Sequence, residues 1–213
     1  MRGAKRRGVR RAAPGPGRVP SGGVARQPAG RGVRMRIEKI HHVAYRCHDA
    51  KQTVQWYGRM PNMGVVPAVA GDAVPSTQAP DRCLHVFLDA GGGNVPAFFE
   101  LPTQAPMGRD PNTPDRVQHI AFKAKDRATL PEYQAHLEAE GVPVPGGTDH
   151  GAFHSIYLLD PNGHRVELAC PDADEAAIHA RLDAVKRDML DEWLKTRRAP
   201  RHAAFLHQPE FQS

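Results

Sequence analysis

The sequence predicts an α+β fold in which two βαβββ modules form a cup-shaped mixed sheet with helices on the outside, followed by a C-terminal helix. Two observations carry this prediction. From residue 37 the segments read strand, helix and three strands, and the same order returns from residue 116. Behind this repeat, an apolar stripe runs at helical spacing. We therefore expect module one at 37–102 and module two at 116–170, within a domain at 35–171, and a helix at 172–196.

Module one begins with β-branched and aromatic residues at 39–46, which predict a strand. Asp49 is a suitable N-cap for a helix that ends near residues 58–61. Three more strands are expected at 63–68, 83–89 and 95–101. A proline-rich connector at 102–115 then leads into module two.

Module two repeats this order with a strand at 117–124 and a helix that Asp126 caps and Gly141 ends. Its remaining strands are expected at 142–148, 153–159 and 164–170. Asp160-Pro161-Asn162-Gly163 is typical of a tight reversal, because proline presets φ while Asn and Gly accept positive φ. The final helix presents Ile178, Leu182, Val185, Met189 and Trp193. That stripe needs a covering surface, and we expect a homodimer.

Composition excludes several functions for the folded part. The chain carries a formal charge of +6, but residues 1–34 contribute +10 from nine Arg and one Lys, which leaves −4 for residues 35–213. A mildly acidic domain predicts no nucleic-acid partner. Residues 1–34 should be a disordered basic extension, which could be upstream sequence, a transit peptide or an RNA-binding tail. Residues 197–213 should be a flexible tail. Three cysteines without metal spacing indicate a cytoplasmic protein, and no apolar run predicts a membrane span.

Four polar residues share one feature: each lies in a strand whose neighbouring side chains are apolar. Because side chains of a strand alternate between its faces, each of these residues points away from an apolar face. They lie in the first and last strands of the two modules, namely His42, Glu100, His119 and Glu167. If the modules pair, the four side chains converge inside the cup. Imidazoles and carboxylates in that arrangement predict a divalent metal site.

The motifs around these residues resemble the vicinal oxygen chelate superfamily of glyoxalases, bleomycin-resistance proteins and type I extradiol dioxygenases. They are IHHVA at 40–44, FFEL at 98–101, VQHIAF at 117–122 and DPNG to VEL at 160–168. The resemblance spans roughly 37–170 and implies paired βαβββ modules around a metal.

The stretch from His150 to Glu167 also fits the signature of ring-cleaving extradiol dioxygenases, with Tyr157 at its fixed position. This resemblance implies Fe(II) held by His42, His119 and Glu167, with open positions for a catechol-like aromatic substrate and O₂. It further implies that His150 moves protons and that Tyr157 donates a hydrogen bond to the substrate.

Two alternatives remain. Glu100 matches the fourth ligand of glyoxalase I-like enzymes, so the chain could be a lyase or epimerase that uses Mn, Ni, Co or Zn, with Glu100 or Glu167 moving the proton. A drug-sequestering binding protein is the third reading, although such proteins need no metal ligands. His41 and His154 could support the ligands from behind. The sequence leaves open whether the modules pair within one chain or between two copies.

Overall fold

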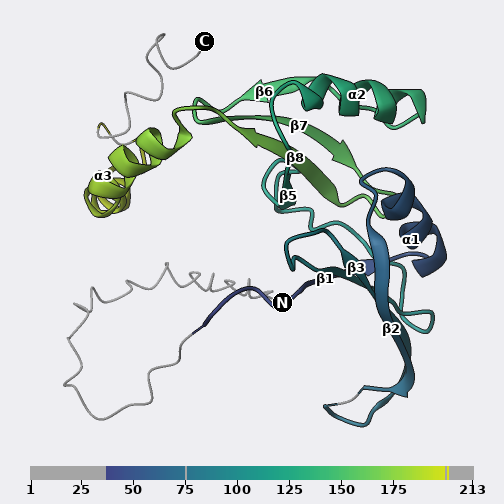
Figure 1. Cartoon of the computed structure of the whole chain (residues 1–213). Coiled ribbons are helices and arrows are strands. Elements are labelled where there is room, and N and C mark those ends of the chain that lie inside the picture. Colours follow the sequence, from purple (N-terminus) through teal and green to yellow (C-terminus); the bar gives the residue numbers. More distant parts are fainter. Residues whose placement is uncertain (1–36, 75, 200, 202–213) are drawn as a thin grey trace, which may run out of the picture. The chain divides into compact units, whose positions relative to one another are not determined.

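The structure is a computed structural model that describes residues 37–74, 76–199 and 201 (Figure 1). The chain separates into two units, residues 1–38 and 39–213, and all the elements belong to the second. They are β1 (Val43–Cys47), α1 (Ala50–Arg59), β2 (Gly64–Ala73), β3 (Pro80–Asp89), β4 (Pro96–Glu100), β5 (His119–Lys123), α2 (Thr129–Ala139), β6 (Gly147–Asp149), β7 (Phe153–Leu159), β8 (Arg165–Pro171) and α3 (Glu175–Thr196). The predicted extension at 1–34, and residues 202–213 of the predicted tail, lie outside the described residues.

The strands form two four-stranded mixed sheets, with the orders β1-β4-β3-β2 and β5-β8-β7-β6. In each sheet the first strand pairs parallel with the last, and the other pairs are antiparallel. This repeated topology confirms the two βαβββ modules and the α+β class. Among the described residues, strands pair only within a module, so the two sheets do not fuse into one ladder in this chain.

The helices cover one face of each sheet and build the core. In module one, α1 buries Ala50, Thr53 and Tyr57, and the Tyr57 ring lies 5.0 Å from the ring of Phe98 on β4. Asp49 caps this helix as predicted, because its side chain accepts from the backbone N of Gln52 at 2.7 Å. In module two, α2 buries Leu130 and Leu137 in the same core cluster. The opposite face of each sheet is left for the site.

The strand before β7 in module two is shorter than predicted. The prediction put a strand at 142–148, but β6 is limited to Gly147–Asp149. Pro143 and Pro145 lack the backbone N–H that a sheet ladder needs, and Gly146 adopts φ of 105°. The short β6 therefore sets where the hairpin to β7 begins.

The turn between β7 and β8 joins the two modules. Asp160 and Asn162 are 5% and 7% exposed. The Tyr57 hydroxyl donates to Asp160 Oδ2 at 3.1 Å, and Asn162 Nδ2 donates to Thr53 Oγ1 at 3.1 Å. Asn162 Oδ1 also accepts from the backbone N of His48 at 2.9 Å. The predicted reversal is thus also the joint that holds α1 against module two.

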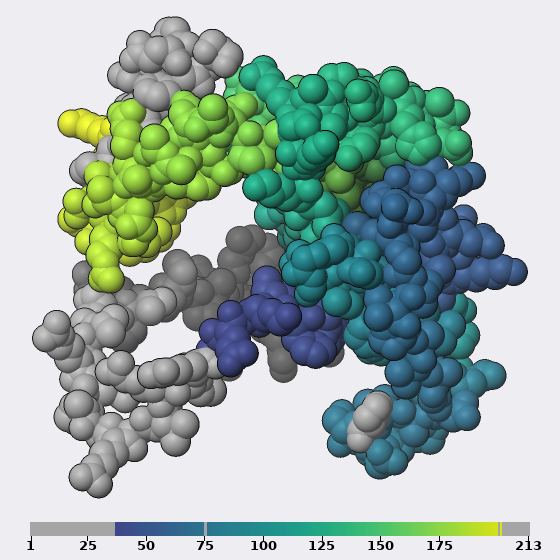
Figure 2. Space-filling model, in the orientation of Figure 1, coloured from purple at the N-terminus to yellow at the C-terminus, as the bar shows by residue number. Residues whose placement is uncertain are grey.

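The C-terminal helix packs chiefly through its beginning. Ile178 is 1% exposed in a small cluster with Ala152, whereas Leu190, Trp193 and Leu194 are between 43% and 64% exposed. Figure 2 shows this helix in yellow-green. Within the described part of the chain, no helix combines the length and the apolar character needed to cross a bilayer.

Candidate metal centre

His119 and Glu167 meet on the face of module two that its helix leaves open. His119 begins β5, and Glu167 lies on the neighbouring β8, opposite Ala121. His119 and Ala121 are two residues apart, so both point to the same side as Glu167. His119 Nε2 lies 2.9 Å from Glu167 Oε2, and the Glu167 side chain is 4% exposed. The structure therefore brings two of the predicted ligands together, the carboxylate buried and the imidazole partly exposed.

The second oxygen of Glu167 is oriented by β7. The Ser155 hydroxyl, which is fully buried, donates to Glu167 Oε1. Sequence reasoning missed Ser155, although its spacing of two from Tyr157 places both on one face of the strand. This hydroxyl fixes the direction of a carboxylate that burial would otherwise make costly.

His150 and Tyr157 complete the group. The Tyr157 hydroxyl lies 3.0 Å from His150 Nε2, which in turn lies 4.0 Å from Glu167 Oε1. His150 is held by the hairpin between β6 and β7, where its backbone N donates to Phe153 O at 3.0 Å and its ring stacks on that of Phe153. His150, predicted to move protons, and Tyr157, predicted to donate a hydrogen bond, thus both lie beside Glu167.

The surroundings keep Tyr157 protonated. Burial raises the pKa of its phenol, and the negative charge of Glu167 raises this pKa further. The Arg165 guanidinium, 4.1 Å from the centre of the ring, acts in the opposite direction. A neutral phenol at this position is a hydrogen-bond donor for an oxygen of a bound molecule.

A pocket of about 1250 Å³ adjoins this group. His119, Tyr157 and Arg165 line it from module two, and Tyr45 lines it from module one. Residues 107–110 of the connector also line it. The pocket is large enough for an aromatic molecule, because ligand pockets commonly measure about 300–1,000 Å³.

His42 lies on module one, apart from this group. It precedes β1, its Nδ1 is 2.8 Å from Nδ1 of His41, and its ring contacts those of His85 and Phe87. Among the described residues, no three of the four predicted ligands approach closely enough to hold one ion. The predicted convergence of all four inside one cup is therefore not present within this chain.

Glu100 requires a correction, because it faces the helix rather than the open side. In module two Ala121 pairs with Glu167, and the equivalent pair in module one is Ala44 with Ala97. Glu100 lies three residues further on, and its Oε2 accepts from the backbone N of Ala50 at 2.7 Å. A carboxylate at the start of α1 is stabilised by the helix dipole. The prediction failed because β4 carries apolar residues on both faces, including Phe98, which shares the face of Glu100.

His85 is a further polar residue that the sequence did not single out. Its ring stacks on Phe99 at 3.6 Å beside His42, and its Nε2 is buried without a hydrogen-bond partner among the described residues. Burial lowers its pKa, and the positive charge that His42 can carry lowers it further. Alternation with Phe87 along β3 was the signal that could have revealed it. Module one therefore offers imidazoles where module two offers an imidazole and a carboxylate.

Comparisons with known proteins agree with this architecture. Residues 39–168 match the family model of the Glyoxalase/Bleomycin resistance protein/Dioxygenase superfamily. MhqA of Bacillus subtilis strain 168, whose name as a ring-cleaving dioxygenase is itself provisional, is 26% identical over 115 residues. That match covers 54% of this chain and 36% of MhqA, so the chain matches only about a third of this relative's length.

Two solved structures are similar to this chain. The fosfomycin resistance protein FosX of Listeria monocytogenes, complexed with Mn(II), is 18% identical, with a TM-score of 0.48 over 67% of this chain and 99% of FosX. Glyoxalase I of Leishmania major is 21% identical, with a TM-score of 0.49 over 73% of this chain and 98% of that enzyme.

Proposed function

We propose that this chain, which belongs to the Glyoxalase/Bleomycin resistance protein/Dioxygenase superfamily, is a metal-dependent enzyme. The reaction we propose is the cleavage of a catechol-like aromatic ring by O₂ in the extradiol manner. The observation that carries this proposal is the register of β4. It puts a buried Ala97 where module two has Glu167, so the modules together offer His42, His119 and Glu167. Two imidazoles and one carboxylate are the ligand set typical of Fe(II) oxygenases, with positions left open. The similarity to MhqA points the same way.

The residues present fit a divalent cation. Glu167 is almost fully buried, and a buried carboxylate is costly unless a positive partner meets it. His119 and the Ser155 hydroxyl already orient its two oxygens. Fe(II) held here by His42, His119 and Glu167 would supply a Lewis acid with open positions for the two substrate oxygens and O₂. Mn, Ni, Co and Zn are the other ions that these ligand types accept.

The chain's own residues then bind and orient the substrate. Tyr157 donates a hydrogen bond from its neutral phenol to one oxygen of the catechol. His150, bonded to Tyr157 and next to Glu167, accepts a proton from a catechol hydroxyl and can return it to the product. The aromatic ring occupies the pocket beside His119 and Tyr157, where Arg165 supplies a positive charge for an anionic substituent.

We further propose that two copies of the chain complete each site. His42 and the pair His119–Glu167 belong to separate sheets, and no strand of one module pairs with the other among the described residues. If the modules pair between two copies, His42 of one copy joins His119 and Glu167 of the other. The protein would then be an obligate homodimer.

The runner-up function, a glyoxalase I-like lyase or epimerase, needs a fourth ligand. Glu100 would have to leave the backbone N–H of Ala50 and turn to the other face of β4. Because the Glu100 carboxylate faces α1 instead of the open side of the sheet, we rank that reaction second.

The deciding experiment is anaerobic reconstitution with Fe(II), followed by O₂ uptake with a panel of catechols. We expect uptake that is lost in His119→Gln and retained in His136→Gln, a control at an exposed histidine of α2. Absence of uptake, together with turnover of methylglyoxal hemithioacetal by the Ni(II) form, would reverse the ranking.

A further inference from the structure

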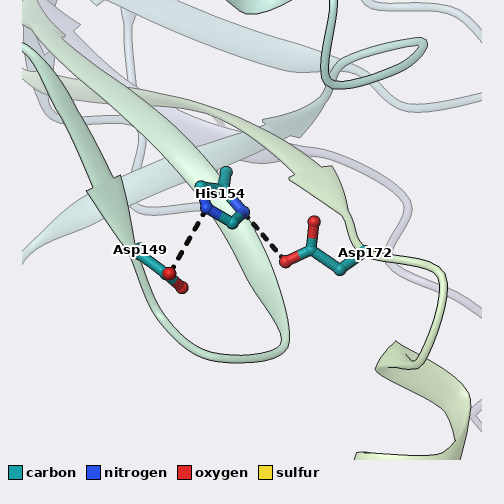
Figure 3. A group of neighbouring side chains, drawn as sticks. All are labelled: Asp149, His154 and Asp172. Carbon is teal, nitrogen blue, oxygen red and sulfur yellow. Dashed lines mark hydrogen bonds and ion pairs between the residues drawn. The ribbon is translucent and has the colours of Figure 1, made fainter. Parts of the chain in front are cut away.

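Three metal-ligating side chains meet on module two outside the site described above (Figure 3). Asp149 ends β6, His154 lies on β7, and Asp172 follows β8. His154 precedes Ser155, whose hydroxyl faces Glu167, so the His154 ring points to the opposite side of the sheet. The cluster is therefore separate from the pair His119–Glu167.

The His154 ring lies between the two carboxylates. Its Nδ1 is 2.8 Å from Asp172 Oδ2, and its Nε2 is 3.4 Å from Asp149 Oδ2. A neutral imidazole carries a single N–H, so it can satisfy only one of these carboxylates. The other contact then sets a nitrogen lone pair against a carboxylate oxygen. A cation shared by the three groups removes this repulsion.

Charge and burial also favour a cation. Arg127 Nη1 lies 3.7 Å from Asp172 Oδ1 and offsets one negative charge, which leaves one carboxylate without a cationic partner when His154 is neutral. The side chains of His154 and Asp172 are 15% and 18% exposed, and that of Asp149 is 31% exposed. Asp149 Oδ1 accepts from the backbone N of Gly151 at 2.6 Å, which leaves Oδ2 directed at the ring.

The geometry fits a small divalent ion. One ligand atom from each residue lies within 4.8 Å of the other two. Zn²⁺ binds nitrogen and oxygen at about 2.0–2.2 Å in a tetrahedral arrangement, which places neighbouring ligand atoms about 3.3–3.6 Å apart, so the three side chains must close in by about 1 Å when an ion binds. An imidazole among the ligands favours Zn²⁺ and related first-row ions over Ca²⁺ or Mg²⁺, which prefer oxygen alone.

We propose that Asp149, His154 and Asp172 form a second divalent-metal site, of the Zn²⁺ class, that fastens the β6–β7 hairpin to the chain segment entering α3. The backbone already runs close here, since Asp172 N donates to Ala152 O at 3.1 Å. Asp149 is the direct neighbour of His150, so an ion at this site also holds the loop that carries the proposed proton-transfer residue. This inference stands independently of the reaction.

Counting bound Zn²⁺ in a chain that lacks the other site tests the proposal. Full-length His119→Gln is dialysed against Zn²⁺, and its metal content is measured by elemental analysis beside His119→Gln/His154→Gln and the control His119→Gln/His179→Gln. His179 is an exposed histidine of α3. We expect one ion per chain in the single variant and in the control, and none in the variant without His154.

A thermal melt keeps the test decisive if a variant is unstable. Zn²⁺ should raise the Tm of His119→Gln, since a ligand that binds the native state stabilises it, and Asp172→Asn should abolish that rise while leaving the metal-free Tm measurable. Zn²⁺ uptake that persists without His154, or no uptake in His119→Gln, would overturn the second site. A rise in Tm at acidic pH without any Zn²⁺ uptake would also overturn the second site, because the cation between the two carboxylates would then be the proton on His154.

Discussion

Glu167 depends on the hydroxyl of Ser155 for its orientation. Ser155 is fully buried and donates to Oε1, while His119 holds Oε2. Groups behind a metal ligand fix its orientation and basicity. Ser155 is therefore a positioning residue, whose loss should weaken metal binding without removing a ligand.

Ser155→Ala should lower the affinity for Fe(II) or Co(II) by about 10- to 100-fold, the range typical of groups that orient metal ligands. Isothermal titration under anaerobic conditions measures this change. Thr103→Ala is the matched control, because it removes a hydroxyl that donates to Asp81 Oδ1 at 2.6 Å on module one. An unchanged affinity in Ser155→Ala would show that Glu167 does not bind the metal through this arrangement.

Strand β4 shows how the register of a strand decides which side chain faces the site. Glu100 and Glu167 both precede a leucine, and alternation alone gave them the same orientation. The pairing with β1 places Ala97, not Glu100, opposite Ala44. Sequence periodicity fixes which residues share a face but not which face meets the helix when both are apolar. That information resides in the contact between Phe98 and Tyr57.

Glu100→Gln should leave metal uptake unchanged and lower stability by about 0.3–1 kcal/mol, because the amide oxygen still accepts from Ala50 but the favourable charge at the helix start is lost. Glu167→Gln should abolish uptake. Elemental analysis and urea unfolding of the two variants provide the comparison. Loss of metal in Glu100→Gln would identify a fourth ligand and make the lyase the leading function.

The sequence predicted both modules, α1 with its cap and the partnership of His119 with Glu167. It did so because alternation, turn residues and capping are local signals. It overextended β6, where two prolines interrupt an otherwise strand-like run. It missed Ser155 and His85, whose importance comes from contacts across neighbouring strands.

At the scale of the whole molecule, the joint between the modules is polar and buried. Tyr57 on α1 donates to Asp160 in the turn of module two. Burial raises the pKa of Tyr57 well above its ordinary value of 10.0, and the charge of Asp160 raises it further. The native state therefore holds this proton more tightly than the unfolded chain does.

Stability should fall as the pH rises through 10.0, the ordinary value of a tyrosine, toward the higher pKa of native Tyr57. Below that range both states keep the proton, and the full stabilisation is present. Urea midpoints measured between about pH 8 and about pH 11 give the slope. Tyr57→Phe should be less stable at neutral pH, by about 1–3 kcal/mol for the lost bond to Asp160, and should show a shallower alkaline slope. An equal slope in the two proteins would contradict this origin.

His42 and His119 belong to separate sheets, so a site that uses both depends on how the two modules pair. If each site takes His42 from one copy and His119 from another, His42→Ala and His119→Ala should complement each other when mixed. Half of the dimers at equal mixing are mixed, and each holds one intact site of two, so activity should reach about a quarter of the wild-type value. Sites formed within a single chain would give none, because every chain then lacks a ligand. The two variants are mixed after mild unfolding and refolded together, and each variant refolded alone is the control. If wild-type protein refolds to full activity but the mixture recovers none, both modules' ligands belong to one chain.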